Sequence, residues 1–293
     1  VMHGAVGTAL GGVCTIVGEP QNLLIATKAD WSFIEFFLRM APVTIPVLFF
    51  GILTCIIIEK LKLSEYGAQL PTTLRDKLID AALKKEKNRT NIENTHLVIE
   101  AFLGILLIFA LAFHLAQVGV IGLFLLVFLT ALKGITSEHD LGEAFKEPLP
   151  FTALLVIFFV IVAVIHDQNL FSPVTSYVLS TSPDIQTPLF FIANGVLSAI
   201  SDNVFVATVY MNEIMAALND GLINREQFDN LAVAINTGTN LPSVATPNGQ
   251  AAFLFLLTSS LAPLIGLSYL KMVYKALPYT CLLYTSGRCR RPM

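Results

Sequence analysis

One carboxylate stands inside a long apolar stretch of this sequence. Asp202 lies in the run 190–217, between Ser201 and Asn203. An ionisable side chain inside a membrane segment costs roughly 2.5–3.5 kcal/mol on insertion scales, and such residues usually serve a function. A buried carboxylate can bind either a proton or a small cation, so the two compete for it. Asp202 is therefore predicted to exchange a proton for a cation, although a helix N-cap at a membrane hairpin tip would produce the same pattern.

Two other stretches place oxygen-bearing side chains between apolar segments. One is Gly18-Glu19-Pro20-Gln21-Asn22, and the other runs from residue 236 to 250. Their hydroxyls, amides and freed carbonyls are the hard oxygen ligands that small cations prefer. Glu19 either faces this site or caps the half-helix that follows it. The predicted ligands of Na⁺ and H⁺ lie at Asp202 and at the two breaks: Asp202, Ser201, Asn203, Thr246, Asn248, Gly249, Asn240, Thr15, Gly18, Glu19 and Asn22.

The same breaks do not decide whether the ligand is a cation or an anion. Helix C-terminal carbonyls favour a cation, whereas half-helix N-termini could instead face an anion. The four cysteines, at positions 14, 55, 281 and 289, lack CxxC or His-paired spacing. They predict neither a metal site nor a disulfide framework, and no cofactor is expected beyond the transported ions.

The composition predicts an integral membrane protein. Of the 293 residues, 55% are hydrophobic and only 13% are charged, whereas soluble domains carry about 25% charged residues. The net charge of −3 offers no basic face to a nucleic acid. Inside a lipid bilayer, a helix can be interrupted only where the freed backbone groups are buried in protein or line a cavity. We therefore expect an all-α polytopic membrane protein whose breaks line a site.

The apolar runs and charged loops predict a topology. Spanning helices are expected at 41–58, 97–113, 117–132 and 149–165, with further apolar runs at 190–218, 251–267 and up to residue 283. Residues 31–39 are expected to lie along the interface, with Trp31 near the headgroups. The loop 59–95 holds eight of the eighteen Lys and Arg residues, so the positive-inside rule places it in the cytoplasm. A surface helix is expected over 72–87. Counting crossings puts 133–148 on the cytoplasmic side and 166–188 outside.

The chain matches itself at an offset of 231 residues. Eight identities fall within 21 positions without a gap: Gly7, Thr8, Leu10, Val13, Thr15, Gly18, Leu23 and Thr27 meet Gly238, Thr239, Leu241, Val244, Thr246, Gly249, Leu254 and Thr258. Two interrupted segments at corresponding places predict a transporter with repeated architecture. If the repeats have inverted topology, both breaks meet at the bilayer midplane and share one site.

Four motifs resemble a known family. They are Gly4 to Gly12 running into Val17 to Leu23, Ala112 to Ala116, Ser201 to Thr208, and Asn236 to Gln250. From about residue 2 to Leu282 the chain closely resembles the NhaB sodium/proton antiporters of bacterial inner membranes. NhaB proteins are longer at the N-terminus, so the chain is expected to be the C-terminal part of one.

The resemblance implies an inverted-repeat transporter with a re-entrant hairpin and unwound transmembrane helices. Ser201-Asp202-Asn203 would form the hairpin tip, Thr246 to Gly249 the unwound part of the next helix, and Gly18 to Asn22 its partner in the first repeat. The expected division is 1–58 for the end of the first repeat, 59–95 for the cytoplasmic loop, and 96–283 for the second repeat. Residues 284–293 would be a tail outside the family pattern, either a basic cytoplasmic tail or a non-native end.

The function implied is exchange of Na⁺, together with Li⁺, for H⁺ by a multi-pass protein of the bacterial inner membrane. The NhaB family belongs to the ion-transporter superfamily, and a homodimer is compatible with that resemblance. The nearest alternative is a sodium-coupled carboxylate or anion carrier of the same fold, but no Arg or Lys stands near the breaks to pair an anion. A membrane-embedded enzyme lacks a catalytic arrangement at usable spacing, and a purely structural subunit would not explain two matching breaks.

Overall fold

The computed structural model describes residues 2–63, 66–67, 72–113, 115–146, 149–168, 170, 172–258 and 261–288. Every regular element within these ranges is a helix, which confirms the all-α fold. The chain forms two compact units, residues 1–64 with 154–293 and residues 65–153. The predicted boundaries after residues 58, 95 and 283 divide the chain by its internal repeat, whereas these two units are defined by compactness. The predicted boundaries therefore stay a prediction.

The larger unit holds both breaks. It contains most of α8 (Leu149–Asp167) and the following elements: α1 (Met2–Gly12), α2 (Pro20–Ala29), α3 (Phe33–Leu61), α9 (Ser172–Leu179), α10 (Pro183–Ile200), α11 (Asn203–Asn219), α12 (Arg225–Asn240), the 3₁₀ turns η2 (Pro242–Ala245) and η3 (Pro247–Gly249), α13 (Ala251–Thr258), α14 (Leu261–Leu264) and α15 (Tyr269–Arg288). The predicted run 190–218 is thus two helices joined at Ser201 and Asp202, and 251–267 is divided between α13 and α14.

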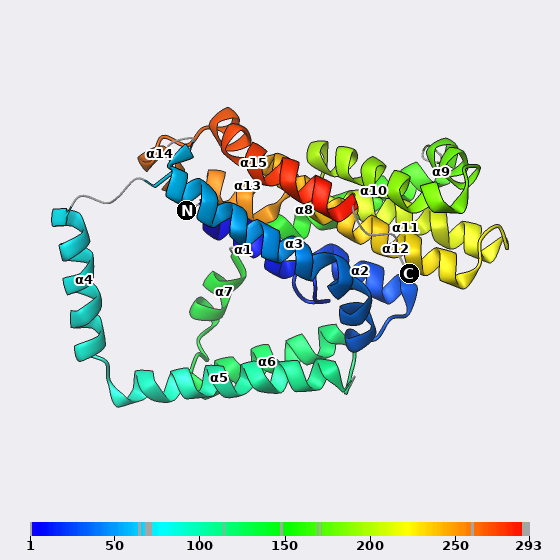
Figure 1. The fold of residues 1–293 in the computed structure, drawn as a ribbon. Coiled ribbons are helices and arrows are strands. Elements are labelled where there is room, and N and C mark those ends of the chain that lie inside the picture. Colours follow the sequence, from blue (N-terminus) through cyan, green and yellow to red (C-terminus); the bar gives the residue numbers. More distant parts are fainter. Residues whose placement is uncertain are drawn as a thin grey trace. The chain divides into compact units, whose positions relative to one another are not determined.

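Helices α10, α11 and α12 pack side by side and form the core of this unit (Figure 1). A Cβ atom at Gly238 of α12 would lie 2.7 Å from the carbonyl oxygen of Phe191 in α10. Only glycine permits so close an approach. The rings of Phe190 and Tyr210 meet edge to face at 5.7 Å between centroids, and both side chains are fully buried. This packing fixes the α10–α11 link against the end of α12.

The first turns of α3 differ from the expectation for residues 31–39. Ser32 caps α3, because its Oγ accepts a hydrogen bond from Glu35 N at 3.2 Å. Trp31 is only 3% exposed, and its indole nitrogen donates to Asp229. Residues 33–39 thus form the first turns of α3, which starts eight residues before the predicted span 41–58, and a buried carboxylate takes the indole N–H of Trp31. The interfacial position of this segment stays a prediction.

The smaller unit contains α4 (Thr72–Lys87), α5 (Asn91–Ala112), α6 (Val118–Leu132) and α7 (Glu138–Lys146). The predicted surface helix over 72–87 and the predicted spans 97–113 and 117–132 are confirmed as helices. Thr90 and Glu93 form a capping box at the start of α5. Helices α5 and α6 pack against each other, and large apolar side chains on both are exposed. Such apolar surfaces are typical of helices that face lipid or another membrane segment.

Within the described residues, α3 and α5 are long and apolar enough to cross a membrane, and α6 is a shorter apolar helix. The predicted span 149–165 lies within α8. Two predicted loops contain helices: α7 lies in 133–148, and α9 lies in 166–188 together with the start of α10. Ser137 supplies a cap that composition alone did not reveal, since its Oγ accepts from Asp140 N at 3.1 Å.

Candidate functional site

The link between α10 and α11 presents Asp202. Its Oδ1 accepts hydrogen bonds from Val204 N at 2.8 Å and from Phe205 N at 3.2 Å, so it caps α11. Within the described part of the chain Oδ2 accepts no hydrogen bond, which leaves one carboxylate oxygen for a ligand. Ser201 lines a small cavity between the two helices, with Phe205 and Tyr210 among its walls. The N-cap alternative is thus confirmed, and it is compatible with ion binding.

The second break lies directly against this link. Thr246 Oγ1 donates to Ala199 O in the last turn of α10 at 2.5 Å. Ser198 Oγ lies within hydrogen-bond distance of Thr239 O, at 2.8 Å, and of Asn203 Oδ1. A Cβ atom at Gly249 would lie 2.6 Å from Ser198 O. The hairpin link and the second break are therefore one packed structure.

The first break connects α1 to α2 through residues 13–19. Asn22 Nδ2 donates to Gly12 O and to Thr15 O, both at 2.8 Å. A Cβ atom at Gly18 would lie 2.0 Å from Gly12 O, so no other residue fits there without a shift of the backbone. The Asn22 amide thus ties back the carbonyls that the helix break leaves without helical partners.

The two breaks contain the same backbone turn. Gly18 N donates to Thr15 O at 3.1 Å, and Gly249 N donates to Thr246 O at 3.3 Å. A Cβ atom at Gly249 would lie 2.5 Å from Ser243 O, as one at Gly18 would crowd Gly12 O. Each pair is related by the 231-residue offset found in the sequence. The internal match therefore corresponds to a repeated local structure.

The two breaks also meet in space. Gln21 Nε2 donates to Asn240 Oδ1 at 2.7 Å, and Asn240 Nδ2 lies 3.3 Å from Asn22 Oδ1. All three amides are at most 1% exposed. Sequence reasoning named Asn22 and Asn240 but missed Gln21, although it quoted the motif that contains it. The oxygens of Asn22 and Asn240 accept hydrogen bonds here, and their role as cation ligands stays a prediction.

A second carboxylate lies near Asp202. Glu19 is the N-cap residue of α2, but its side chain makes no capping hydrogen bond. It interacts electrostatically with Asp202, so the two acids belong to one neighbourhood. The capping hydrogen bond predicted for Glu19 is thus not made, and its role at the site stays a prediction.

Oxygens other than carboxylates dominate this region. No cluster of three or more His, Cys, Asp or Glu suited to a metal ion occurs in the described part of the chain. The side chain of Asn248 lies outside the described residues. The other predicted residues of both breaks and of the hairpin link gather in the larger unit, where hydroxyl, amide and carbonyl oxygens supplement Asp202 and Glu19.

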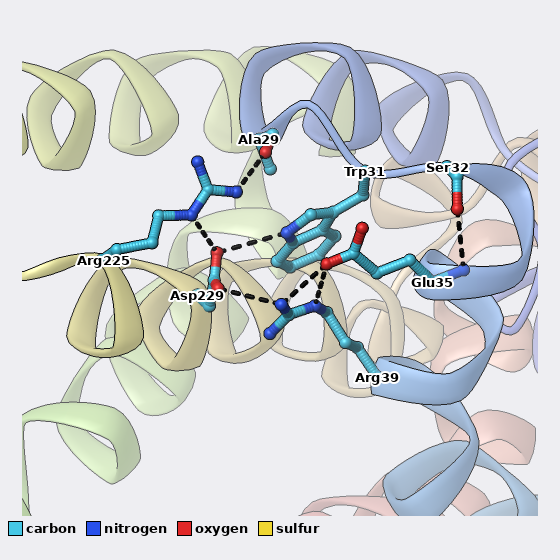
Figure 2. A network of polar contacts seen from close by, with 7 residues as sticks. All are labelled: Ala29, Trp31, Ser32, Glu35, Arg39, Arg225 and Asp229. Atoms are coloured by element: carbon cyan, nitrogen blue, oxygen red, sulfur yellow. Dashed lines mark hydrogen bonds and ion pairs between the residues drawn. The ribbon is translucent and has the colours of Figure 1, made fainter.

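A charged network that the sequence did not predict joins the end of α2 to the start of α12, away from the two breaks (Figure 2). Asp229 accepts from the Trp31 indole at 3.2 Å and pairs with Arg39 at 3.0 Å and with Arg225 at 2.9 Å. Its side chain is only 8% exposed. Arg225 also donates to Ala29 O. The only sequence signal was the set of charges in the polar link 219–230, which carries no indication of partners nearly 200 residues away.

The model of the family Bacterial Na⁺/H⁺ antiporter B (NhaB) matches residues 1–289 of the chain. The chain belongs to the NhaB family. The match extends past residue 283, where the sequence resemblance was expected to end. Since the relatives below are named as antiporters, the family is one of transporters rather than enzymes.

Curated NhaB proteins cover nearly the whole chain. The Na⁺/H⁺ antiporter NhaB of Teredinibacter turnerae is 63% identical over 98% of the chain and 57% of its own length. That of Saccharophagus degradans is 63% identical over 98% of the chain and 58% of its length, and that of a Marinomonas strain is 62% identical over 98% and 57%. The chain thus spans less than three fifths of the relatives it matches. No solved structure matches it.

Proposed function

We propose that this chain forms the ion-binding part of a bacterial inner-membrane transporter that exchanges Na⁺, and also Li⁺, for H⁺. Its relatives are named Na⁺/H⁺ antiporters and cover 98% of the chain at 61–63% identity. Asp202 is the group for which the proton and the cation compete, because it lies where the hairpin link meets the second break. The remaining ligands come from the oxygens of both breaks.

The observation that favours a cation over an anion is the capping of α11 by Asp202. A helix N-terminus attracts anions through its free N–H groups and its dipole, but here the Asp202 carboxylate already occupies that place. The C-terminal ends of α10 and α12, which carry partial negative charge, both lie at the second break. This arrangement supports a cation site and argues against a carboxylate carrier.

The direction of two helices supports inverted repeats. Helix α2 begins at the first break, where Gln21 meets Asn240 at the end of α12. It ends where Ala29 meets Arg225 at the start of α12. Helices α2 and α12 therefore run in opposite directions, as inverted topology requires of two broken helices. In this proposal α10 and α11 form a re-entrant hairpin, and the protein alternates access around the shared site.

The membrane arrangement follows from charge. The loop 59–95, rich in Lys and Arg, faces the cytoplasm, so the start of α3 and the link before α12 lie on the opposite side. Trp31, Arg39 and Asp229 then form a network at the external ends of these helices. The protein spans the lipid bilayer several times, and a homodimer is compatible with this arrangement.

The test uses a chimera in which this chain replaces the matching segment of the Teredinibacter turnerae relative. Everted vesicles carrying the chimera are given an acid interior, and a pH-sensitive dye follows the gradient. Addition of Na⁺ or Li⁺ is expected to collapse the gradient, while the unmodified relative serves as the positive control. If Na⁺ leaves the gradient intact while a dicarboxylate enters right-side-out vesicles only with Na⁺ present, the carrier alternative replaces the proposal.

A further inference from the structure

Gln250 is a buried amide at the end of the second break, and it is only 1% exposed. Its Nε2 donates to Asn240 O at 3.3 Å and to Ser243 Oγ at 3.2 Å. Sequence reasoning included Gln250 in the broken motif but gave it no role. The two hydrogen bonds use the nitrogen of the amide and leave its oxygen to be accounted for.

The orientation of this amide is fixed by its neighbours. Ser243 Oγ donates its own proton to Asn240 O at 2.7 Å, so the hydroxyl oxygen can only accept from Gln250. A flipped amide would place Oε1 against the Asn240 carbonyl, which is an acceptor and has no proton to offer. Oε1 therefore points away from Asn240, and it has no hydrogen-bond partner within the described part of the chain.

An acceptor buried without a partner is destabilising, and such an atom in a folded protein calls for a ligand or another explanation. Amide oxygens are ordinary ligands of hard cations. The neighbourhood favours positive charge, since the ends of α10 and α12 lie beside the same break and the negative ends of helix dipoles attract cations.

The repeat gives an independent reason to look at this position. At the offset of 231 residues, Gln250 corresponds to Glu19. Each follows the glycine of the shared turn, Gly249 or Gly18, whose N–H bonds the threonine three residues earlier. Glu19 interacts electrostatically with Asp202. The position after the turn therefore holds an oxygen-bearing side chain in both breaks, a carboxyl group in the first and an amide in the second.

We propose that Gln250 Oε1 is a direct ligand of the transported cation at the second break. This rests on the proposed exchange function and deepens it. Because the amide stays neutral and takes up no proton, it contributes to cation affinity without joining the competition between H⁺ and Na⁺ at Asp202. Gln250 is thus a residue that sets the affinity for Na⁺ and its selectivity against Li⁺.

The experiment measures Na⁺-dependent and Li⁺-dependent proton movement in vesicles carrying the chimera. Gln250→Leu removes the oxygen at similar volume, whereas Gln250→Glu keeps an oxygen at the same reach. The matched control is Gln186→Leu. Gln186 is also buried, at 3% exposed, and its oxygen accepts from Gln227. The Gln186→Leu variant therefore measures the effect of losing a buried amide whose oxygen already accepts a hydrogen bond.

Gln250→Leu is expected to raise the apparent KM for Na⁺ about tenfold or more, with the maximal rate within about twofold of the unsubstituted chimera. Its Na⁺ to Li⁺ preference is expected to change as well. Gln250→Glu is expected to retain more Na⁺ affinity than Gln250→Leu and to make exchange more sensitive to pH, because its second oxygen can donate to Asn240 O only when it is protonated. Gln186→Leu is expected to leave the apparent KM for Na⁺ and the apparent KM for Li⁺ unchanged.

Two results would overturn the inference, and a third would reject the proposed function on which it rests. An unchanged KM for Na⁺ in Gln250→Leu, with exchange intact in the unsubstituted chimera, would mean that a bound water or packing satisfies Oε1. If Gln250→Leu fails to reach the membrane, Gln250→Glu becomes the deciding variant. An unaltered apparent KM for Na⁺ and an unaltered pH profile of exchange in Gln250→Glu would contradict a ligand role for Gln250. Absence of Na⁺-dependent exchange in the unsubstituted chimera, with the relative active, would instead reject the proposed function itself.

Discussion

Gln21 of the first helix break donates a hydrogen bond to Asn240 of the second, with 2.7 Å between Nε2 and Oδ1. The two residues lie 219 positions apart in the chain, and both are buried. Asn240 also lies against Asn22. This contact joins the two interrupted helices directly.

Gln21→Leu is predicted to destabilise the protein. The substitution leaves Asn240 Oδ1 buried without its donor, which costs about 1–3 kcal/mol. Thermal unfolding of the purified chimera in detergent measures the effect, and Gln168→Leu, at an exposed amide, is the control. Equal melting temperatures for the two variants would show that the tie between the breaks contributes nothing to stability.

The turn glycines are predicted to tolerate no side chain. A Cβ atom at Gly18 would meet Gly12 O at 2.0 Å, and one at Gly249 would meet Ser243 O at 2.5 Å. Each alanine variant should lose about 1–3 kcal/mol of stability, as overpacked cores do. The matched control is Gly11→Ala, where nothing lies within 4 Å of the added atom. Stable, fully assembled Gly18→Ala and Gly249→Ala proteins would contradict the tight turns.

The sequence predicted what depends on local composition. Gly18 and Pro20 in one stretch, and Pro242 to Gly249 in the other, marked both breaks because closely spaced glycine, proline and small polar residues favour turns over helix. The charged helix α4 was also correct to the residue, since its polar pattern needs no tertiary partner. The repeat further predicted that the two breaks would meet, but not which amides would touch.

Features that depend on distant partners could not be predicted in this way. Trp31 suits a membrane interface by type, yet its indole bonds Asp229, 198 residues later. Asp229 itself belonged to a charged link that any solvated loop could resemble. Gln250 had a signal, its correspondence to Glu19, but an unpartnered oxygen is visible only once its surroundings are known.

Asp229→Asn is predicted to be strongly destabilising. The carboxylate is 8% exposed and pairs with Arg39 and Arg225, and removing one partner of a buried ion pair leaves uncompensated charge at a cost of about 3–5 kcal/mol. Because both arginines are partly exposed, the lower end of that range is expected. Asp229→Glu should recover part of the loss.

The control for this variant is Glu226→Gln, at an exposed position on the same helix. Melting temperatures of the chimera in detergent are compared at low and high salt. If Asp229→Asn unfolds at the temperature of Glu226→Gln, the network in Figure 2 is not a stabilising link between α2, α3 and α12.

The most direct measurement compares Asp202→Asn with Asp202→Ala in the chimera. Asparagine caps a helix about as well as aspartate, whereas alanine does not, so the first variant removes only the charge and the second removes charge and cap. Vesicle assays follow Na⁺-dependent collapse of an acid-interior gradient, and thermal unfolding follows the cap. Asp202→Asn is expected to fold like the unsubstituted protein yet exchange no Na⁺ for H⁺, while Asp202→Ala is expected to be both inactive and less stable. Retained exchange in Asp202→Asn would reduce Asp202 to a helix cap and contradict the central claim.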